Sequence, residues 1–140
     1  MKNYEECIGK SCSYTRTVSE SDVYLFGGIS GDMHPMHYNE EFMKKTEFSR
    51  RIAHGMLIAS YMSTAGSLLI LQMKWNTVSY GYDKIRFIKP VFIGDTVTCV
   101  ETVARVDDDG KFFADITCTN QDGVLVAVAT HVSKFIEVKE

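Results

Sequence analysis

The fold is decided by the stretch HGMLIASYMSTAGSLLILQM, residues 54–73. From Met56 to Met73 it runs for eighteen residues without a charged side chain. Apolar residues would occur on nearly every side of a helix formed by this stretch. We therefore predict a helix from about His54-Gly55 to about Leu71 that other parts of the chain must enclose.

The same stretch is long enough to cross the hydrocarbon layer of a bilayer. However, serine, threonine, glycine and glutamine residues interrupt it, and the only close basic flank is Arg50-Arg51. The sequence therefore favours a helix buried within the protein, and we expect no membrane partner.

After this helix the sequence changes to the alternation of β-branched and aromatic residues that is typical of strands. Asp109-Gly110 and Asp122-Gly123 separate the later runs and indicate tight turns between antiparallel strands. The expected fold class is α+β, with an antiparallel sheet of about five strands wrapped round the long central helix. The predicted strands cover residues 14–18, 77–88, 95–106, 111–120 and 124–138.

Two shorter helices are expected before the long one. Ser19 can cap the first, with Asp22 at the third position as in a capping box. Asn39 can begin the second, which is acidic at its start and basic at its end, as the helix dipole prefers. Between the two, Gly31 and Pro35 predict a loop without regular structure.

The chain has 140 residues, 45% of them hydrophobic, which predicts a single domain over residues 1–140. A formal net charge of -3 with interspersed signs offers no basic stripe for nucleic acid, so a small-molecule partner is expected. The four cysteines form no C-x-x-C pair and are interpreted as reduced thiols. The first residues lack the apolar core of a secretory signal, which predicts a cytoplasmic location.

The candidate site lies on the predicted loop Gly31-Asp32-Met33-His34-Pro35-Met36-His37. The carboxylate of Asp32 and the imidazole of His37 can converge there on one water molecule, one accepting its proton and the other orienting it. No G-x-S-x-G motif is present, which favours acid-base chemistry over nucleophilic catalysis. Gly55 would stand at the start of the long helix, where a free N–H can polarise a carbonyl oxygen.

Metal binding is the rival interpretation of the same residues. Asp32, His34, His37 and His54 carry oxygen and nitrogen ligands of the kinds that bind zinc or iron. The histidines straddle Pro35 on a short loop, and no H-E-x-x-H pattern is present. We therefore predict no metal, and interpret His54 as a structural, partly buried histidine.

Three spaced motifs resemble those of the MaoC-like (R)-specific enoyl-CoA hydratases of the hot-dog fold. They are F-x-x-x-S-G-D-x-H-P-x-H over residues 26–37, F-x-x-x-I-A-H-G-M over 48–56 and R-F-x-K-P-V-F-x-G-D over 86–95. The similarity covers about residues 15–137. It implies hydration of a trans-2-enoyl-CoA to a (3R)-hydroxyacyl-CoA, or the reverse, in at least a dimer and with no cofactor beyond the thioester carrier.

The resemblance also implies roles for individual residues. Asp32 and His37 would be the catalytic pair, and Gly55 would donate its amide to the thioester oxygen. Ser63, further along the helix, would line the site near the pair. His34 stands where the family usually has asparagine, which leaves the internal hydrogen bonding of the loop open.

Further contacts follow from residue chemistry. Met56, beside the helix start, could touch acyl carbons. The basic side chains that could meet coenzyme A phosphates are Arg86, Lys89, Arg50 and Arg51. Two other functions stay open on the same fold, namely thioester hydrolysis and a non-catalytic acyl-binding subunit. The sequence does not determine the acyl chain length of the substrate. It also does not determine whether coenzyme A or acyl carrier protein carries the acyl group.

Overall fold

The computed structural model describes residues 3–139 and contains one antiparallel sheet of five strands in the order β1-β3-β4-β5-β2. Every strand predicted from the sequence is present, with bounds that shift by a few residues. The α+β fold class is therefore confirmed. The strands are β1 Ser11–Thr17, β2 Thr77–Phe87, β3 Thr96–Val106, β4 Lys111–Thr119 and β5 Leu125–Phe135.

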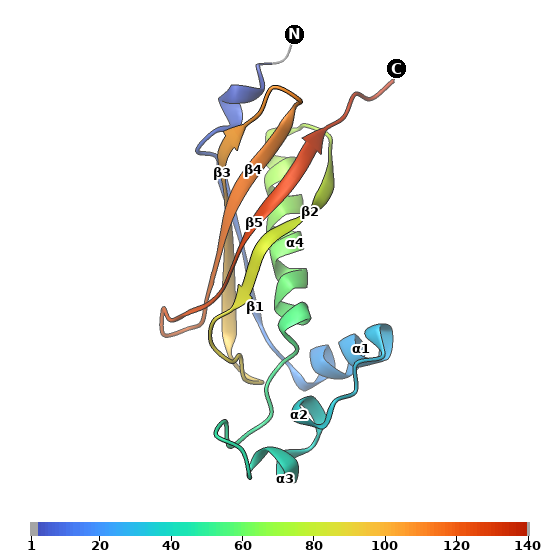
Figure 1. Ribbon diagram of the computed structural model, residues 1–140, viewed down its shortest axis with the longest axis vertical. Helices are drawn as coiled ribbons and strands as arrows, with labels where there is room; N and C mark the ends of the chain where they lie inside the picture. Colours follow the sequence, from blue (N-terminus) through green and yellow to red (C-terminus); the bar gives the residue numbers. More distant parts are fainter. Residues whose placement is uncertain (1–2, 140) are drawn as a thin grey trace.

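The long apolar helix, α4, spans Gly55–Met73 and lies lengthwise against the sheet (Figure 1). The sheet covers one side of it and does not surround it. Met56 and Leu71, on the other side, keep 58% and 73% of their surface exposed. The helix residues that are buried are Leu57, Ile58, Tyr61, Met62, Ala65, Gly66 and Leu69.

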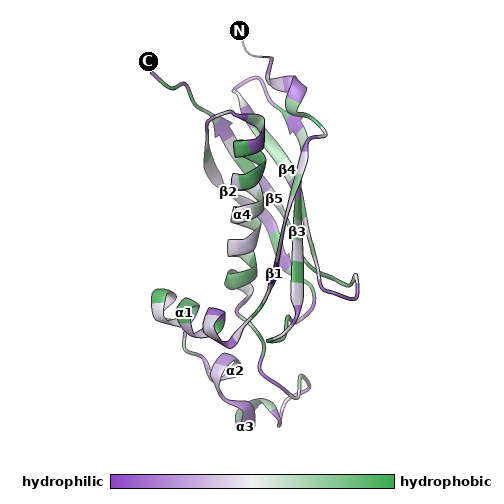
Figure 2. Cartoon of the chain, turned by 180° about the vertical axis from the view of Figure 1, so that it is seen from behind, coloured by the Kyte–Doolittle hydropathy of each residue, from purple (hydrophilic) through white to green (hydrophobic). Residues whose placement is uncertain are grey.

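The strands meet α4 with one face because side chains alternate along a strand. In β3, for example, Val97, Cys99, Glu101 and Val103 are buried, while the residues between them are less so. Among residues 3–139, α4 is the one helix long and apolar enough to cross a membrane. Figure 2 shows a paler, more polar middle to this helix, and its packing on the sheet is that of a core helix.

Three short helices gather at one end of the molecule, beneath the first turn of α4 (Figure 1). They are α1 Glu20–Ser30, α2 Pro35–Tyr38 and α3 Glu40–Met43, and a 3-10 turn, η1 Tyr4–Cys7, lies near the N-terminus. Ser19 and Asp22 form the predicted capping box, and Asn39 caps α3. The prediction of an irregular loop at Pro35 is wrong, because proline suits the first position of a helix and begins α2.

The short helices are held together by Arg51, which we considered as a contact for coenzyme A phosphates. Its guanidinium instead pairs with Glu20 of α1 and, at 2.7 Å, with Glu40 of α3. Only 10% of the Arg51 side chain is exposed. Arg51 therefore joins α1 and α3 to the segment that leads into α4.

We expect Arg51→Gln to lower the free energy of unfolding, because it removes the two ion pairs that join α1 and α3 to the segment before α4. Chemical denaturation followed by circular dichroism measures this. Glu41→Gln, which removes the exposed pair with Lys44, should change nothing measurable. If Arg51→Gln and the unaltered protein are equally stable, the two ion pairs do not stabilise the fold.

The interpretation of all four cysteines as free thiols is wrong. Cys99 of β3 stands directly opposite Cys118 of β4 in the sheet register, and the two form a disulfide. Their sequence separation of 19 residues gave no sign of this neighbourhood. Cys7 and Cys12 are free. The cytoplasmic location, argued from the lack of a secretory signal, stays a prediction.

Candidate active site

The three motifs meet at the first turn of α4, around a cavity of about 340 Å³. His37 from α2 and Gly55 from α4 lie on its wall, and apolar side chains from β2, β5 and the connections make up most of the rest. A mostly apolar cleft with a few polar groups is the usual form of a small-molecule site. Its other lining residues include Phe48, Ile58, Phe87, Pro90, Val91 and Val126.

His37 is buried, and a backbone carbonyl orients its ring. Its Nδ1 lies 2.7 Å from the carbonyl oxygen of Ile52, which can only accept, so Nδ1 carries the proton. Nε2 is then left as an acceptor. Burial lowers the pKa of the imidazole below its ordinary 6.5, outweighing the hydrogen bond to Ile52 and the charge of Asp32, which raise it. His37 is thus a neutral acceptor at neutral pH.

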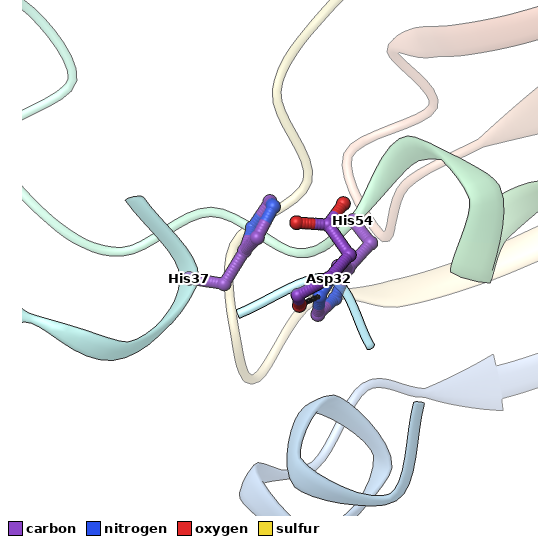
Figure 3. A group of neighbouring side chains, drawn as sticks. All are labelled: Asp32, His37 and His54. Carbon is purple, nitrogen blue, oxygen red and sulfur yellow. Dashed lines mark hydrogen bonds between the residues drawn. The ribbon is translucent and has the colours of Figure 1, made fainter. Parts of the chain in front are cut away.

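Asp32 stands on the turn between α1 and α2, with its side chain exposed. Its carboxylate and one ring nitrogen each of His37 and His54 all lie within 4.8 Å of one another (Figure 3). A water molecule that makes hydrogen bonds of about 2.8 Å on both sides fits such a gap. Asp32 and His37 can therefore hold one water between them, as their spacing predicted.

His54 contacts both His37 and Asp32 and helps to hold them in place. Its ring is buried and stacks on His37, with centroids 3.8 Å apart and planes 24° apart. Its Nε2 lies 2.8 Å from the backbone carbonyl oxygen of Asp32, to which it donates. The ring is buried, as predicted, but its Nδ1 has no partner within residues 3–139, and its purely structural role stays a prediction.

The stacked rings also bear on the metal alternative. The three groups are close enough together to hold an ion. A metal bound to imidazole, however, lies near the plane of the ring, and two nearly parallel planes do not meet within a bond length of about 2.1 Å. The arrangement of His37 and His54 therefore does not fit a shared ion.

Gly55 is the first residue of α4, and the first N–H groups of a helix have no partner within the helix. In residues 3–139 we find no hydrogen bond from the Gly55 amide. A side chain at Gly55 would meet the ring of Phe87, whose Cδ2 would lie 2.6 Å from the added carbon. Glycine thus allows the cavity wall to approach a free N–H donor.

The side chain of His34 caps the short helix α2. Its Nδ1 accepts from the backbone N–H of Met36 at 3.1 Å and caps α2. Its own N–H lies 3.4 Å from the Asp32 carboxylate. His34 therefore supplies a helix cap of the kind that asparagine can also form.

Three residues predicted for the site lie elsewhere in the chain. Ser63 lies more than two turns along α4 and lines a separate cavity of this chain, and its place near the catalytic pair stays a prediction. Met56 is exposed and does not line the first cavity. Arg86 is also exposed, and its guanidinium bonds the carbonyl of Ile85.

Sequence reasoning missed the Ile52 carbonyl that orients His37 and did not single out the apolar wall formed by Phe87 and Ile88. A backbone carbonyl leaves no mark in the residue pattern. The wall could have been found, because Phe87 and Pro90 stand inside the third motif.

The model of the MaoC like domain matches residues 5–127. The chain belongs to this family. An (R)-specific enoyl-CoA hydratase of Rhodospirillum rubrum is 40% identical over 84% of the chain and 81% of that protein. The solved structure of the (R)-hydratase from A. caviae has a TM-score of 0.82 at 29% identity, over 92% of this chain and 96% of that one. A mitochondrial 3-hydroxyacyl-[acyl-carrier-protein] dehydratase of Arabidopsis thaliana is 26% identical over 86% of this chain and 72% of that protein.

Proposed function

We propose that this MaoC-like protein interconverts a trans-2-enoyl-CoA and a (3R)-hydroxyacyl-CoA by adding or removing water. The observation that carries the proposal is that His37 and Gly55, with its free amide, line one mostly apolar cavity, and that the Asp32 carboxylate lies within 4.8 Å of a His37 ring nitrogen. Water activation and an oxyanion donor are what addition to an α,β-unsaturated thioester requires. The hydratases among the relatives support the same activity.

In the hydration direction the water lies between Asp32 and His37 Nε2. Asp32 takes a proton from the water while the water oxygen forms a bond to C3 of the substrate. His37 accepts the other hydrogen in a hydrogen bond and positions the water. The proton held by Asp32 then passes to C2 on the same face, so that one polar pair serves both steps.

The thioester oxygen gains negative charge as the bond to C3 forms. The Gly55 N–H, at the positive end of the α4 dipole, donates to this oxygen. The apolar wall that includes Phe87 and Val126 surrounds the acyl chain and excludes bulk water. No cofactor takes part in these steps.

The test uses purified protein with enoyl thioesters of short, medium and long acyl chain, each on coenzyme A and on acyl carrier protein. Loss of enoyl absorbance with formation of the (3R)-hydroxyacyl product supports the proposal, and the ratio of kcat/KM values identifies the carrier. Release of free thiol from saturated acyl-CoA without hydration would assign the thioesterase alternative. Inactivity on all these thioesters would assign an acyl-binding subunit.

The hydration activity should fall at acidic pH, because His37 must be neutral for its Nε2 to accept a hydrogen bond from the water. Burial lowers the pKa of His37 below 6.5, so kcat/KM should hold down to about neutral pH and fall as pH drops through that lowered value. A profile of kcat/KM against pH measures the acid limb. A limb centred at or above pH 6.5 would contradict the assignment of His37.

We also propose that the chain self-associates into at least a dimer. Large apolar side chains remain exposed on α1, where Leu25 and Ile29 keep 64% and 84% of their surface, and on α4. Light scattering coupled to size-exclusion chromatography should give at least twice the chain mass of 15.8 kDa. A single species at the chain mass would refute self-association.

A further inference from the structure

His54, the residue immediately before α4, contacts both members of the catalytic pair (Figure 3). Its ring stacks on that of His37, with 3.8 Å between the centroids. Its Nε2 lies 2.8 Å from the backbone carbonyl oxygen of Asp32. The next residue in the chain is Gly55, the proposed oxyanion donor. One residue thus contacts or adjoins the base, the water acceptor and the oxyanion donor.

Two acceptors fix the proton of His54 on Nε2. The first is the carbonyl oxygen of Asp32. The second is the hydroxyl oxygen of Tyr38, which lies 3.4 Å from Nε2 and gives its own hydrogen to the carbonyl of Val23 at 2.8 Å. Since neither group can donate to Nε2, this nitrogen carries the hydrogen. His54 is therefore a donor to the turn that carries Asp32.

The bond from His54 is the long-range hydrogen bond of Asp32. Within residues 3–139, Asp32 is bonded to Ser30, His34 and His54. Ser30 and His34 lie two positions away, so their bonds shape the turn without fixing its place in the molecule. His54 is 22 positions away, and its bond is the one that ties Asp32 to the start of α4.

Packing alone does not account for this histidine. With the proton on Nε2, Nδ1 is a buried acceptor, and it has no partner within residues 3–139. A phenylalanine ring could stack in the same place, on His37 and beside Phe26, without leaving a polar atom unpaired. What the imidazole adds over such a ring is the N–H that bonds Asp32.

We propose that His54 is a positioning residue for the hydration put forward above, on which this inference rests. Its N–H holds the turn of Asp32 at the start of α4, and its ring keeps the plane of His37 fixed. The base, the water acceptor and the Gly55 amide therefore keep one geometry. A misplacement of about 1 Å can lower a rate about 10²-fold, so one hydrogen bond to the turn of the base affects the reaction. His54 acts through Asp32 and exchanges no proton with the substrate.

Two substitutions separate the N–H from the ring. His54→Phe keeps a stacked ring and removes the donor, whereas His54→Gln removes the ring and keeps an amide N–H that can bond Asp32. For hydration of the best enoyl thioester, kcat should fall about 10²-fold in His54→Phe and stay within about fivefold in His54→Gln. KM should stay within about twofold in both, because His54 does not line the cavity.

Tyr38→Phe is the matched control. It removes the hydroxyl that touches the same nitrogen and leaves the bond from His54 to Asp32 in place. Its kcat should stay near that of the unaltered protein, although loss of the bond to Val23 should lower the melting temperature. A loss of kcat as large as in His54→Phe would overturn the proposal, because loosening of the cluster would then explain both variants.

The titration of His37, followed by nuclear magnetic resonance, gives a readout that is independent of activity. Burial lowers the pKa of His37, and the neighbouring His54 and His34 lower it further. The hydrogen bond to Ile52 and the charge of Asp32 raise it. In His54→Gln the pKa of His37 should rise, because a neighbouring imidazole and the cover of its ring are lost. The acid limb of kcat/KM should then move to higher pH. An unchanged pKa would contradict the contact that places His37.

The hydration rates decide the role of the N–H. If His54→Phe keeps kcat within about twofold, or if His54→Phe and His54→Gln lose kcat equally, the N–H does not position the base and the proposal fails. An unaltered protein that hydrates no enoyl thioester would instead refute the proposed function itself. Thermal melts beside each assay ensure that folded proteins are compared.

Discussion

Asp32→Asn is expected to lower kcat/KM for hydration by about 10²- to 10⁴-fold, the usual contribution of a positioned general base. The amide cannot take the proton of the water. The fold should persist, because the hydrogen bond that the Asp32 side chain accepts from the His34 N–H can be accepted by the amide oxygen. Steady-state hydration of the best enoyl thioester measures the effect, beside melting temperature.

The matched control for this variant is Asp115→Asn, which changes another exposed carboxylate, on β4. It should keep full activity. If Asp32→Asn also stays within about twofold of the unaltered protein, Asp32 is not the base. A folded variant that is inactive supports the water site between Asp32 and His37.

His37→Asn should cause a loss of similar size, about 10²- to 10⁴-fold in kcat/KM. The asparagine amide can still donate to the Ile52 carbonyl, as His37 Nδ1 does, so the packing of α2 is largely kept. What disappears is Nε2, the acceptor that positions the water. Hydration rates and circular dichroism together separate this loss from unfolding.

His34→Asn is the control on the neighbouring histidine. Asparagine is among the best helix caps, so it should replace the His34 cap on α2 and leave kcat/KM nearly unchanged. The acid limb of the pH profile should disappear with His37→Asn and remain with His34→Asn. Retention of that limb in His37→Asn would move its origin to another group.

The sequence by itself determined the elements of the fold. The apolar stretch that became α4, the alternating runs that became strands and the caps at Ser19 and Asn39 depend on side chains a few residues apart. Such local patterns can be recognised in the sequence without a structure. The error at Pro35 was also local, since proline favours both a loop and the first turn of a helix.

The pairing of Asp32 with His37 could also be predicted, because both stand within one short turn and recur in a known motif. The orientation of His37 could not. It depends on the Ile52 carbonyl, fifteen residues away, which the bridge between Ile52 and Phe92 helps to place. The cavity that Ser63 lines in this chain could not be predicted either, because a position along α4 does not tell which way the side chain faces.

Only the tertiary structure decided the contacts across the sheet. Cys99 meets Cys118, and His131 lies between Glu101 and Ser79, because strand register places residues 19, 30 and 52 positions apart side by side. A shift of one residue in register would turn each side chain to the opposite face. The sequence thus determined which elements form and where the candidate site lies, and the packing of β2 and β5 on α4 created the separate cavity that Ser63 lines.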